Sequence, residues 1–203
     1  MSTIASESVG QFLAALAERS PAPGGGAAAG LVGATACSLA SMVVAYSVGK
    51  ASLAQHSGEL NEASGVLART RALFLELAER DSEAFAEYSR IKQLPEGSDE
   101  RSELESAARA VIEIPMAALR ASTELGTFIE RLVPITNANL RSDAEVAGVL
   151  AEASAASAAC NVRVNLPLVE DADERAKIET RVAEAVAEAA ETRRRIETAC
   201  RGG

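Results

Sequence analysis

The sequence predicts an all-α protein, an antiparallel helical bundle of about six helices with a small-residue central helix, forming a single domain over residues 1–203. Apolar residues recur at helical spacing through most of the chain, and no segment of useful length alternates as a strand would. With 203 residues, 48% of them hydrophobic, the chain is long enough to bury a core. Because only 3% of the residues are aromatic, that core must consist mainly of Ala, Leu, Val and Ile.

A proline and glycine segment, SPAPGGG at Ser20–Gly26, separates the first two predicted helices. The first is expected over residues 5–19, because Phe12 and Leu16 share a face and a residue before proline disfavours helix. The second contains mostly small residues and closes near Gly49. One side of it is almost free of side chains, because Gly30, Gly33 and Cys37 all fall within about 40° of Gly26 around the helix. Another helix can therefore approach that side closely.

Apolar spacing and turn residues mark four more helices. The third is expected over residues 53–93, with these residues on its apolar side: Leu67, Leu73, Phe74, Leu77, Phe85, Tyr88 and Ile91. The turn LPEGS precedes a fourth helix, which Pro115 should kink. Ser142 and Glu145 have the spacing of a capping box at the start of the fifth helix. A charged sixth helix begins at about Asp171.

The composition argues against several classes of partner. A net charge of −9 disfavours binding to nucleic acid or to an anionic membrane, since both require clustered Lys and Arg. The weakly polar run Ala27–Val48 has the length of a membrane span, but it contains four Ser or Thr residues and only two leucines. We interpret it as a buried helix and expect no membrane partner.

The cysteines and the first residues indicate a cytoplasmic protein. Three widely separated cysteines lack the spacing of metal ligands and fit reduced thiols: Cys37, Cys160 and Cys200. The segment MSTIASESVG has neither a basic region nor an apolar core, so we expect no signal peptide. His56 is the sole histidine and has polar neighbours, which leaves little support for a zinc site or a Ser-His-Asp triad. We expect no bound metal.

Three consecutive glycines before a helix also resemble a phosphate-binding loop. A Walker loop requires Lys and then Ser or Thr after its last glycine, whereas Gly26 is followed by three alanines. A dinucleotide-binding fingerprint must follow a β-strand, and the preceding segment VGQFLAALAERS has helical spacing instead. Nucleotide binding is therefore the weaker interpretation of these glycines.

Asp81 is the clearest polar residue on an apolar face. It lies four residues after Leu77 and four before Phe85, within the core-facing side of the third helix. Burial there disfavours the charged form and should raise its pKa. The spacing alone leaves three interpretations open, namely a catalytic carboxylate, a buried partner of Lys or Arg, and a residue at the edge of the face.

A second set of polar residues occurs in the loop before the fifth helix and along that helix: Asn137, Asn139, Ser142, Asp143, Asn161 and Asn165. Asn161 and Asn165 are one turn apart, and Asp143 falls on the same face about 27 Å away. Within one chain these residues line the two ends of a long groove, or they meet through a partner chain. Ligand contact and bridging between helices both remain open for the asparagines. Lys50 follows Gly49 and is either a surface lysine or a cation at one end of the small-residue helix.

Five ordered motifs, PAPGGG, GK, DSEAF, NANLRSD and NVRVN, together resemble the cyclodeaminase/cyclohydrolase family of one-carbon folate metabolism. The resemblance covers nearly the whole chain. It implies an all-helical homodimer that binds a tetrahydrofolate derivative as substrate, with no permanently bound cofactor, in a groove shaped by both protomers.

The resemblance implies one of two reactions. A methenyltetrahydrofolate cyclohydrolase hydrolyses 5,10-methenyltetrahydrofolate to 10-formyltetrahydrofolate, whereas a formiminotetrahydrofolate cyclodeaminase closes the formimino compound with loss of ammonia. Family members of this length are often cyclohydrolases, whereas the cyclodeaminase is commonly fused to a formiminotransferase domain. The resemblance therefore favours the cyclohydrolase. A folate-binding helical protein without turnover is the non-enzymatic alternative.

The expected roles follow from these motifs. Asp81 is the expected acid/base, with Asp143 as second choice, and Lys50 would stabilise the adduct or orient the carboxylate. Residues expected to contact the substrate or shape its groove are Pro23, Gly24, Gly25, Gly26, Asn137, Asn139, Ser142, Asn161 and Asn165. Arg141 and Arg163 are further candidates for contact with the glutamate tail.

Overall fold

The computed structural model describes residues 4–202 and confirms an all-α fold with six α-helices and no strand in that part of the chain. The helices are α1 (Val9–Leu16), α2 (Gly25–Ala45), α3 (Ser57–Lys92), α4 (Leu104–Leu132), α5 (Arg141–Asn165) and α6 (Ala172–Arg201). Short 3-10 helices lie between them at Ile4–Ser6, Ala51–His56, Asp99–Glu103, Val133–Ile135, Ala138–Leu140 and Leu166–Leu168.

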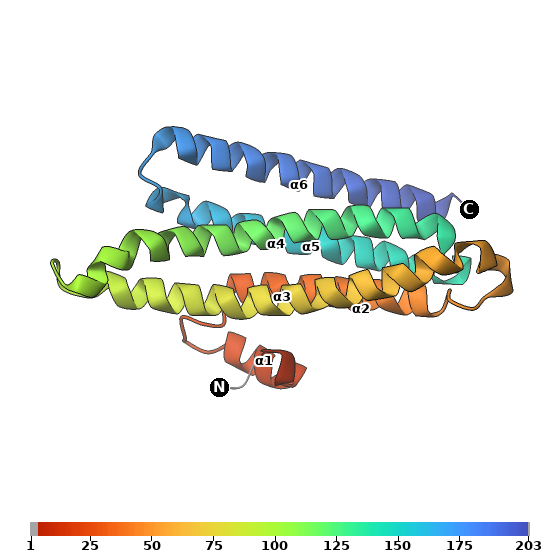
Figure 1. The fold of residues 1–203 in the computed structure, drawn as a ribbon, viewed down its shortest axis with the longest axis horizontal. Helices are drawn as coiled ribbons and strands as arrows, with labels where there is room; N and C mark the ends of the chain where they lie inside the picture. Colours follow the sequence, from red (N-terminus) through yellow and green to blue (C-terminus); the bar gives the residue numbers. More distant parts are fainter. Residues whose placement is uncertain (1–3, 203) are drawn as a thin grey trace.

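The long helices run side by side, and α3 and α4 form a hairpin that extends beyond the others (Figure 1). α2 packs against α3 and α5, and α5 packs against α4 and α6. The short helix α1 lies to one side of this bundle, where Phe12 packs on Ala27 of α2 and Ala78 of α3. This arrangement places the first turn of α2 beside the middle of α3.

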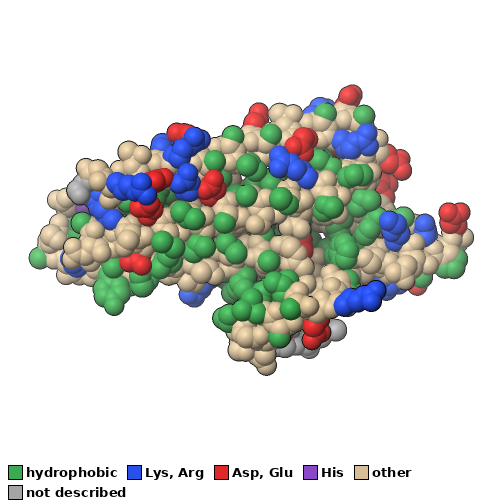
Figure 2. Space-filling view, turned by 180° about the vertical axis from the view of Figure 1, so that it is seen from behind, with side chains coloured by type: hydrophobic (Ala, Val, Ile, Leu, Met, Phe, Trp, Pro, Cys, Tyr) green, Lys and Arg blue, Asp and Glu red, His purple; other side chains and the backbone are tan. Residues whose placement is uncertain are grey.

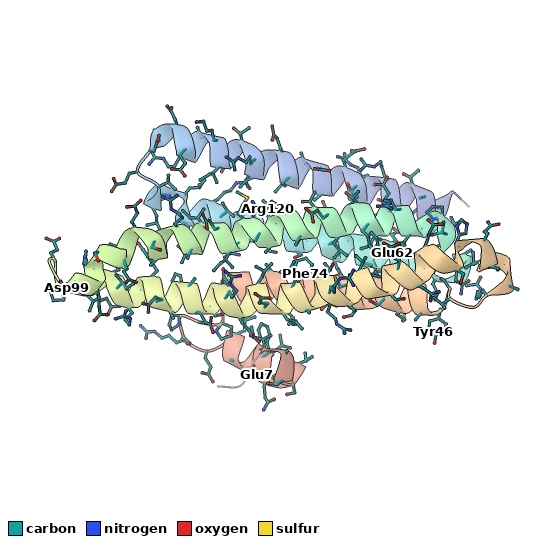
Figure 3. The ribbon with its side chains drawn as sticks, in the orientation of Figure 1. Glu7, Tyr46, Glu62, Phe74, Asp99 and Arg120 are labelled. Atoms are coloured by element: carbon teal, nitrogen blue, oxygen red, sulfur yellow. The ribbon has the colours of Figure 1, made fainter. Side chains whose placement is uncertain are left out.

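The small-residue side of α2 faces α3, in line with the prediction that another helix approaches this side closely. A Cβ added at Gly30 would lie 2.8 Å from the Phe74 carbonyl oxygen, and one added at Gly33 would lie 2.6 Å from the Phe74 ring. Phe74 is fully buried and projects from α3 among the helices (Figure 3). The two helices therefore approach closely because α2 has glycine at these positions. Among the described residues, α2 is the helix long and apolar enough to cross a membrane, and 56% of its most apolar stretch is buried, as in a core helix.

Several predicted boundaries and faces are wrong. α1 is shorter than expected, because Ser8 and Gln11 form a capping box that starts the helix at Val9. The predicted capping box at Ser142 is absent, since α5 already begins at Arg141. On α3, Leu73 and Phe85 are 42% and 39% exposed rather than buried. The predicted start of the sixth helix is confirmed, with the side chain of Asp171 accepting hydrogen bonds at its N-terminus.

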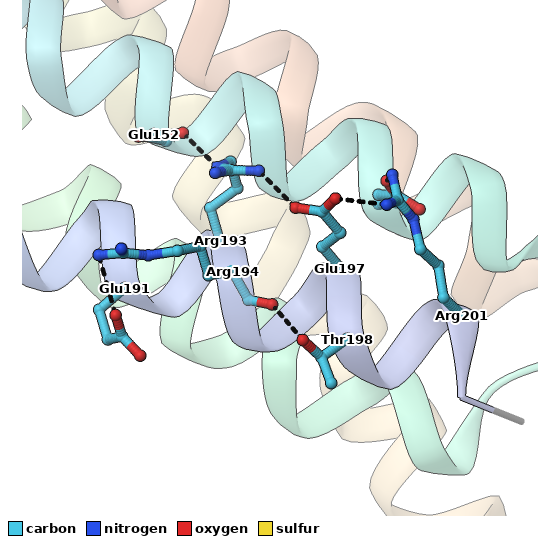
Figure 4. Close-up of polar contacts among 8 residues, drawn as sticks. Glu152, Glu191, Arg193, Arg194, Glu197, Thr198 and Arg201 are labelled. Carbon is cyan, nitrogen blue, oxygen red and sulfur yellow. Dashed lines mark hydrogen bonds and ion pairs between the residues drawn. The ribbon is translucent and has the colours of Figure 1, made fainter.

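Ion pairs join α5 and α6 along one edge (Figure 4). Arg193 contacts Glu152 at 2.8 Å and Glu197 at 2.7 Å. Arg201 contacts Glu197 at 2.7 Å and Glu145 at 2.9 Å. Glu145 thus binds α6 instead of capping α5. A connected set of charges fixes α6 more firmly than isolated surface pairs would.

Candidate functional site

Asp81 lies against the glycine-rich start of α2. A Cβ at Gly26 would overlap the Asp81 carboxylate, so the absence of a side chain at Gly26 creates the space for it. Burial raises the pKa of the Asp81 carboxyl above its ordinary value. Within residues 4–202, no Lys, Arg or His forms an ion pair with Asp81, and no hydrogen bond to its side chain is present. Of the interpretations left open by the sequence, pairing with a cation is therefore excluded within the described part of the chain.

A small cavity of about 10 Å³ adjoins the Asp81 carboxylate, which is about the space that one water molecule requires. It is lined by Gly26, Ala29, Gly30, Leu77, Asp81, Ile114, Pro115, Ala118 and Ala158. Asp81 is the only one of these residues with a polar side chain. A carboxylate in such apolar surroundings can accept and return a proton near neutral pH.

Asn161 reaches the same helix start from α5. A Cβ added at Gly25 would lie 2.9 Å from Asn161 Oδ1, so this glycine also makes room for a polar side chain. Asn161 Nδ2 donates to the Ser157 carbonyl at 2.9 Å. Gly24 is the N-cap residue and Pro23 immediately precedes it. Because the first N–H groups of a helix have no intrahelical acceptor, the start of α2 offers N–H donors beside Asp81 and Asn161.

Asn165 forms hydrogen bonds between helices. Its Nδ2 donates to the Val111 carbonyl of α4 at 2.8 Å and to the Asn161 carbonyl at 3.1 Å. The sequence suggested either ligand contact or helix bridging, and for the amide nitrogen of Asn165 the structure shows bridging. The sequence did not reveal the acceptor, which is the Val111 carbonyl of α4. Pro115, four residues after Val111, is the signal that could have identified it, because proline has no N–H to donate to that carbonyl.

The other predicted site residues gather at the opposite end of α2. The backbone N–H of Asn137 donates to Ser47 Oγ at 2.8 Å, which ties the loop before α5 to the end of α2. Asn137 Oδ1 accepts from the N–H of Asn139 at 3.2 Å. In this region Lys50 and Ser142 are exposed and Asp143 is half-buried. α2 has 21 residues and is about 30 Å long, so one chain does not bring Lys50 or Asp143 to Asp81.

The two arginine candidates are engaged elsewhere. Arg141 donates to the Ala199 carbonyl at the end of α6, at 2.6 Å. Arg163 pairs with Glu179 at 3.0 Å. His56 lies beside Glu59 at 3.1 Å, on the surface of the bundle. Burial raises the pKa of the Cys37 thiol to about 12, so this residue is a structural thiol.

A larger cavity lies away from these residues. It has a volume of about 620 Å³ and is bordered by the end of α3, the start of α4 and the start of α6. Five carboxylates line it, at Glu105, Glu113, Glu170, Asp171 and Glu174. Its two arginines are already engaged, because Arg101 donates to backbone carbonyls and Arg109 pairs with Glu105. This cavity is therefore poorly suited to an anionic ligand.

Comparison with known proteins identifies the family. Residues 8–184 match the model of the formiminotransferase-cyclodeaminase family. The chain is 32% identical to methenyltetrahydrofolate cyclohydrolase of Methylorubrum extorquens over 179 residues, covering 84% of this chain and 86% of that protein. It is 27% identical to formimidoyltransferase-cyclodeaminase of Gallus gallus, covering 85% of this chain but only 32% of that protein.

A solved structure shows the same fold over almost the full length. The crystal structure of formiminotetrahydrofolate cyclodeaminase from Thermotoga maritima superimposes with a TM-score of 0.88 and 30% identity, covering 97% of this chain and 96% of that one. The resemblance noted from the five motifs is thus confirmed by sequence and structure. The chain belongs to the formiminotransferase-cyclodeaminase family, whose cyclodeaminases and cyclohydrolases are enzymes of one-carbon folate metabolism.

Proposed function

We propose that this protein is a methenyltetrahydrofolate cyclohydrolase, acting in the cytoplasm without a bound cofactor. The supporting observation is the Asp81 carboxylate, which has no ion-pair partner in the described part of the chain and lies beside an apolar cavity of about one water volume. Hydrolysis of the methenyl group requires a water molecule and a base that takes its proton. Ring closure with loss of ammonia requires no water as nucleophile.

In the proposed reaction, water forms a C–O bond with the electrophilic methenyl carbon while the Asp81 carboxylate takes one water proton. N–H groups of Gly25 and Gly26 stabilise the oxygen that this step adds. The adduct hydroxyl then loses its proton as the formyl C=O forms. The bond between this carbon and N5 breaks, and protonated Asp81 returns a proton to N5. One proton is released to solvent for each substrate consumed.

The alternative activity is that of a formiminotetrahydrofolate cyclodeaminase. The Thermotoga maritima protein bears that name and matches this chain over 96% of its length, so chain length does not separate the two activities. In the deaminase reaction, N10 attacks the formimino carbon and loses its proton to Asp81, which would then protonate the amino group so that the C–N bond breaks and ammonia leaves. Ammonia release from the formimino substrate is therefore the discriminating measurement.

The direct test supplies purified protein with 5,10-methenyltetrahydrofolate and follows the loss of its absorbance, alongside Asp81→Asn. We expect the wild-type protein to accelerate the loss and Asp81→Asn to lower the rate by about 10²- to 10⁴-fold. A wild-type protein that released ammonia from the formimino substrate but left the methenyl compound intact would refute the hydrolase assignment. Folate binding without either reaction would indicate a binding protein.

We further propose that two chains form the complete site, because Asp81 and Lys50 lie at opposite ends of α2. One face of the bundle is suited to self-association. A stripe of exposed residues without charge follows α5 at steps of three or four residues: Ser142, Val146, Val149, Ala153, Ala156, Cys160 and Val164. The neighbouring α2 contains no charged residue, and exposed positions on it or directly after it include Thr35, Ser38, Ala45 and Tyr46. Figure 2 shows charged side chains along one edge of the rear side and a largely uncharged band below them.

A two-fold axis across this face would pack α2 and α5 antiparallel to the same helices of a second copy. The end with Asn137, Asp143 and Lys50 in one protomer would then lie beside Asp81 and Asn161 of its partner. A seam of small and apolar residues at helical spacing supports such packing.

Mixing two inactive variants tests the shared site. Asp81→Asn and Lys50→Met are each expected to be inactive as homodimers. Unfolding and refolding them together at equal concentration should restore about a quarter of wild-type activity, because half of the dimers are mixed and each mixed dimer has one intact site. Separately refolded variants, combined afterwards, serve as the control. No recovery in verified mixed dimers would refute the shared site.

A further inference from the structure

Pro115 leaves a backbone acceptor without its usual partner in the middle of α4. Proline has no N–H, so the hydrogen bond that residue 115 would donate to the carbonyl of Val111 is missing. Val111 is only 3% exposed. A buried carbonyl without a donor is costly, and such groups are nearly always paired.

Asn165 supplies the missing donor from another helix. Its Nδ2 lies 2.8 Å from the Val111 carbonyl oxygen and 3.1 Å from the carbonyl oxygen of Asn161. A side-chain amide has two N–H donors, and these two contacts use both. Asn165 therefore has no side-chain N–H left to donate to a ligand, which favours helix bridging over ligand contact, the two roles that the sequence left open.

The bonded segment forms one wall of the site. Ile114 and Pro115 of α4 border the small cavity beside Asp81, together with Gly26 and Gly30 of α2. The carbonyl of Asn161 is the second acceptor, and the side chain of Asn161 contacts the start of α2. One amide group thus links the proline segment of α4 to the last turn of α5, which holds Asn161.

We propose that Asn165 is a positioning residue that replaces the hydrogen bond lost at Pro115 and so holds the Pro115 wall of α4 against Asp81. The catalytic part of this proposal rests on the proposed function, whereas the coupling between Asn165 and Pro115 does not. Asn165 acts on the reaction through the closed, water-poor surroundings of the Asp81 carboxylate.

A double-mutant cycle in the full-length protein tests the coupling without any substrate. Asn165→Ala alone should lower the melting temperature by about 3 to 8 °C, because Val111 loses its donor. In the Pro115→Ala background the new N–H of residue 115 can bond Val111 itself, and Asn165→Ala should then lower the melting temperature by less than half as much. Asn161→Ala is the matched control, since the side chain of Asn161 donates to the Ser157 carbonyl and not to Val111, so its effect should be equal in both backgrounds.

The dependence of kcat/KM on pH tests the positioning role. Asn165→Ala should admit water beside Asp81, so the acid limb of the profile should move toward the ordinary pKa of an aspartate, about 3.9. A purely structural defect would lower the amplitude without moving that limb. Equal melting shifts in both backgrounds would overturn the coupling even if the enzyme is a cyclohydrolase, and an unmoved limb would overturn the positioning role. An inactive wild-type protein would instead refute the proposed function.

Discussion

Replacement of Gly26 by alanine should displace the Asp81 carboxylate while leaving the fold intact. The added methyl group would overlap that carboxylate, which must rotate or shift by roughly 1 Å or more. A displacement of this size at a reacting group costs about 10²-fold in rate, or about 2.7 kcal/mol in the activation barrier. The stability cost should be smaller, because overpacking costs about 1–3 kcal/mol and the gain in helix propensity returns up to about 1 kcal/mol.

The assay compares kcat/KM for methenyltetrahydrofolate with the free energy of unfolding for Gly26→Ala and for a matched control. Gly58→Ala, in the first turn of α3, is suitable because an added Cβ meets no atom within 4 Å. It should leave the rate unchanged and stabilise the protein slightly. If Gly26→Ala retained wild-type kcat/KM in a folded protein, the placement of Asp81 as acid/base beside this glycine would be wrong.

Three further predictions follow from burial and exposure. Burial raises the pKa of Asp81, so the folded protein keeps the carboxyl proton to higher pH than the unfolded chain does. Ionisation of Asp81 therefore lowers the stability of the folded protein. Asp81→Asn should raise the melting temperature at pH 7 to 8, and this gain should vanish as the pH falls toward about 4. Val149→Glu should give a monomer by sedimentation that has no hydrolase activity. Leu73→Glu is the matched control, because Leu73 is 42% exposed and Val149 is 43% exposed, and this variant should stay dimeric and active. Cys37 should resist a thiol reagent at pH 8 in the folded protein. Cys160 should react faster in the Val149→Glu monomer than in the wild-type dimer. Equal reaction rates of Cys160 in the two proteins would contradict the proposed dimer face.

The sequence predicted helix boundaries reliably where the spacing of apolar residues agreed with nearby turn or capping residues. SPAPGGG separates α1 from α2, and Asp171 caps α6, because both signals act within a few residues. Ser142 and Glu145 had the spacing of a capping box, yet Glu145 pairs with Arg201, which is 56 residues away. Local spacing contains no information about such a distant partner.

Prediction of the candidate site was limited in the same way. Helical spacing placed Asp81 on the core-facing side of α3 and glycines on the facing side of α2, and the structure brings the two together. The separation of Asp81 and Lys50 by roughly the length of α2 depends on how the helices are arranged, which the motifs do not specify. The role of Asn165 required knowledge of which helix lies opposite, although Pro115 already marked an unpaired carbonyl.

A dimer formed through the uncharged face of α2 and α5 would make folding depend on protein concentration. If a second copy covers this face, part of the folding free energy comes from association, and dilution removes it. We therefore expect the melting temperature to rise with protein concentration. At the nanomolar concentrations of a sensitive rate assay, specific activity should fall with time after dilution, and prompt addition of an inactive Asp81→Asn partner should slow that decline.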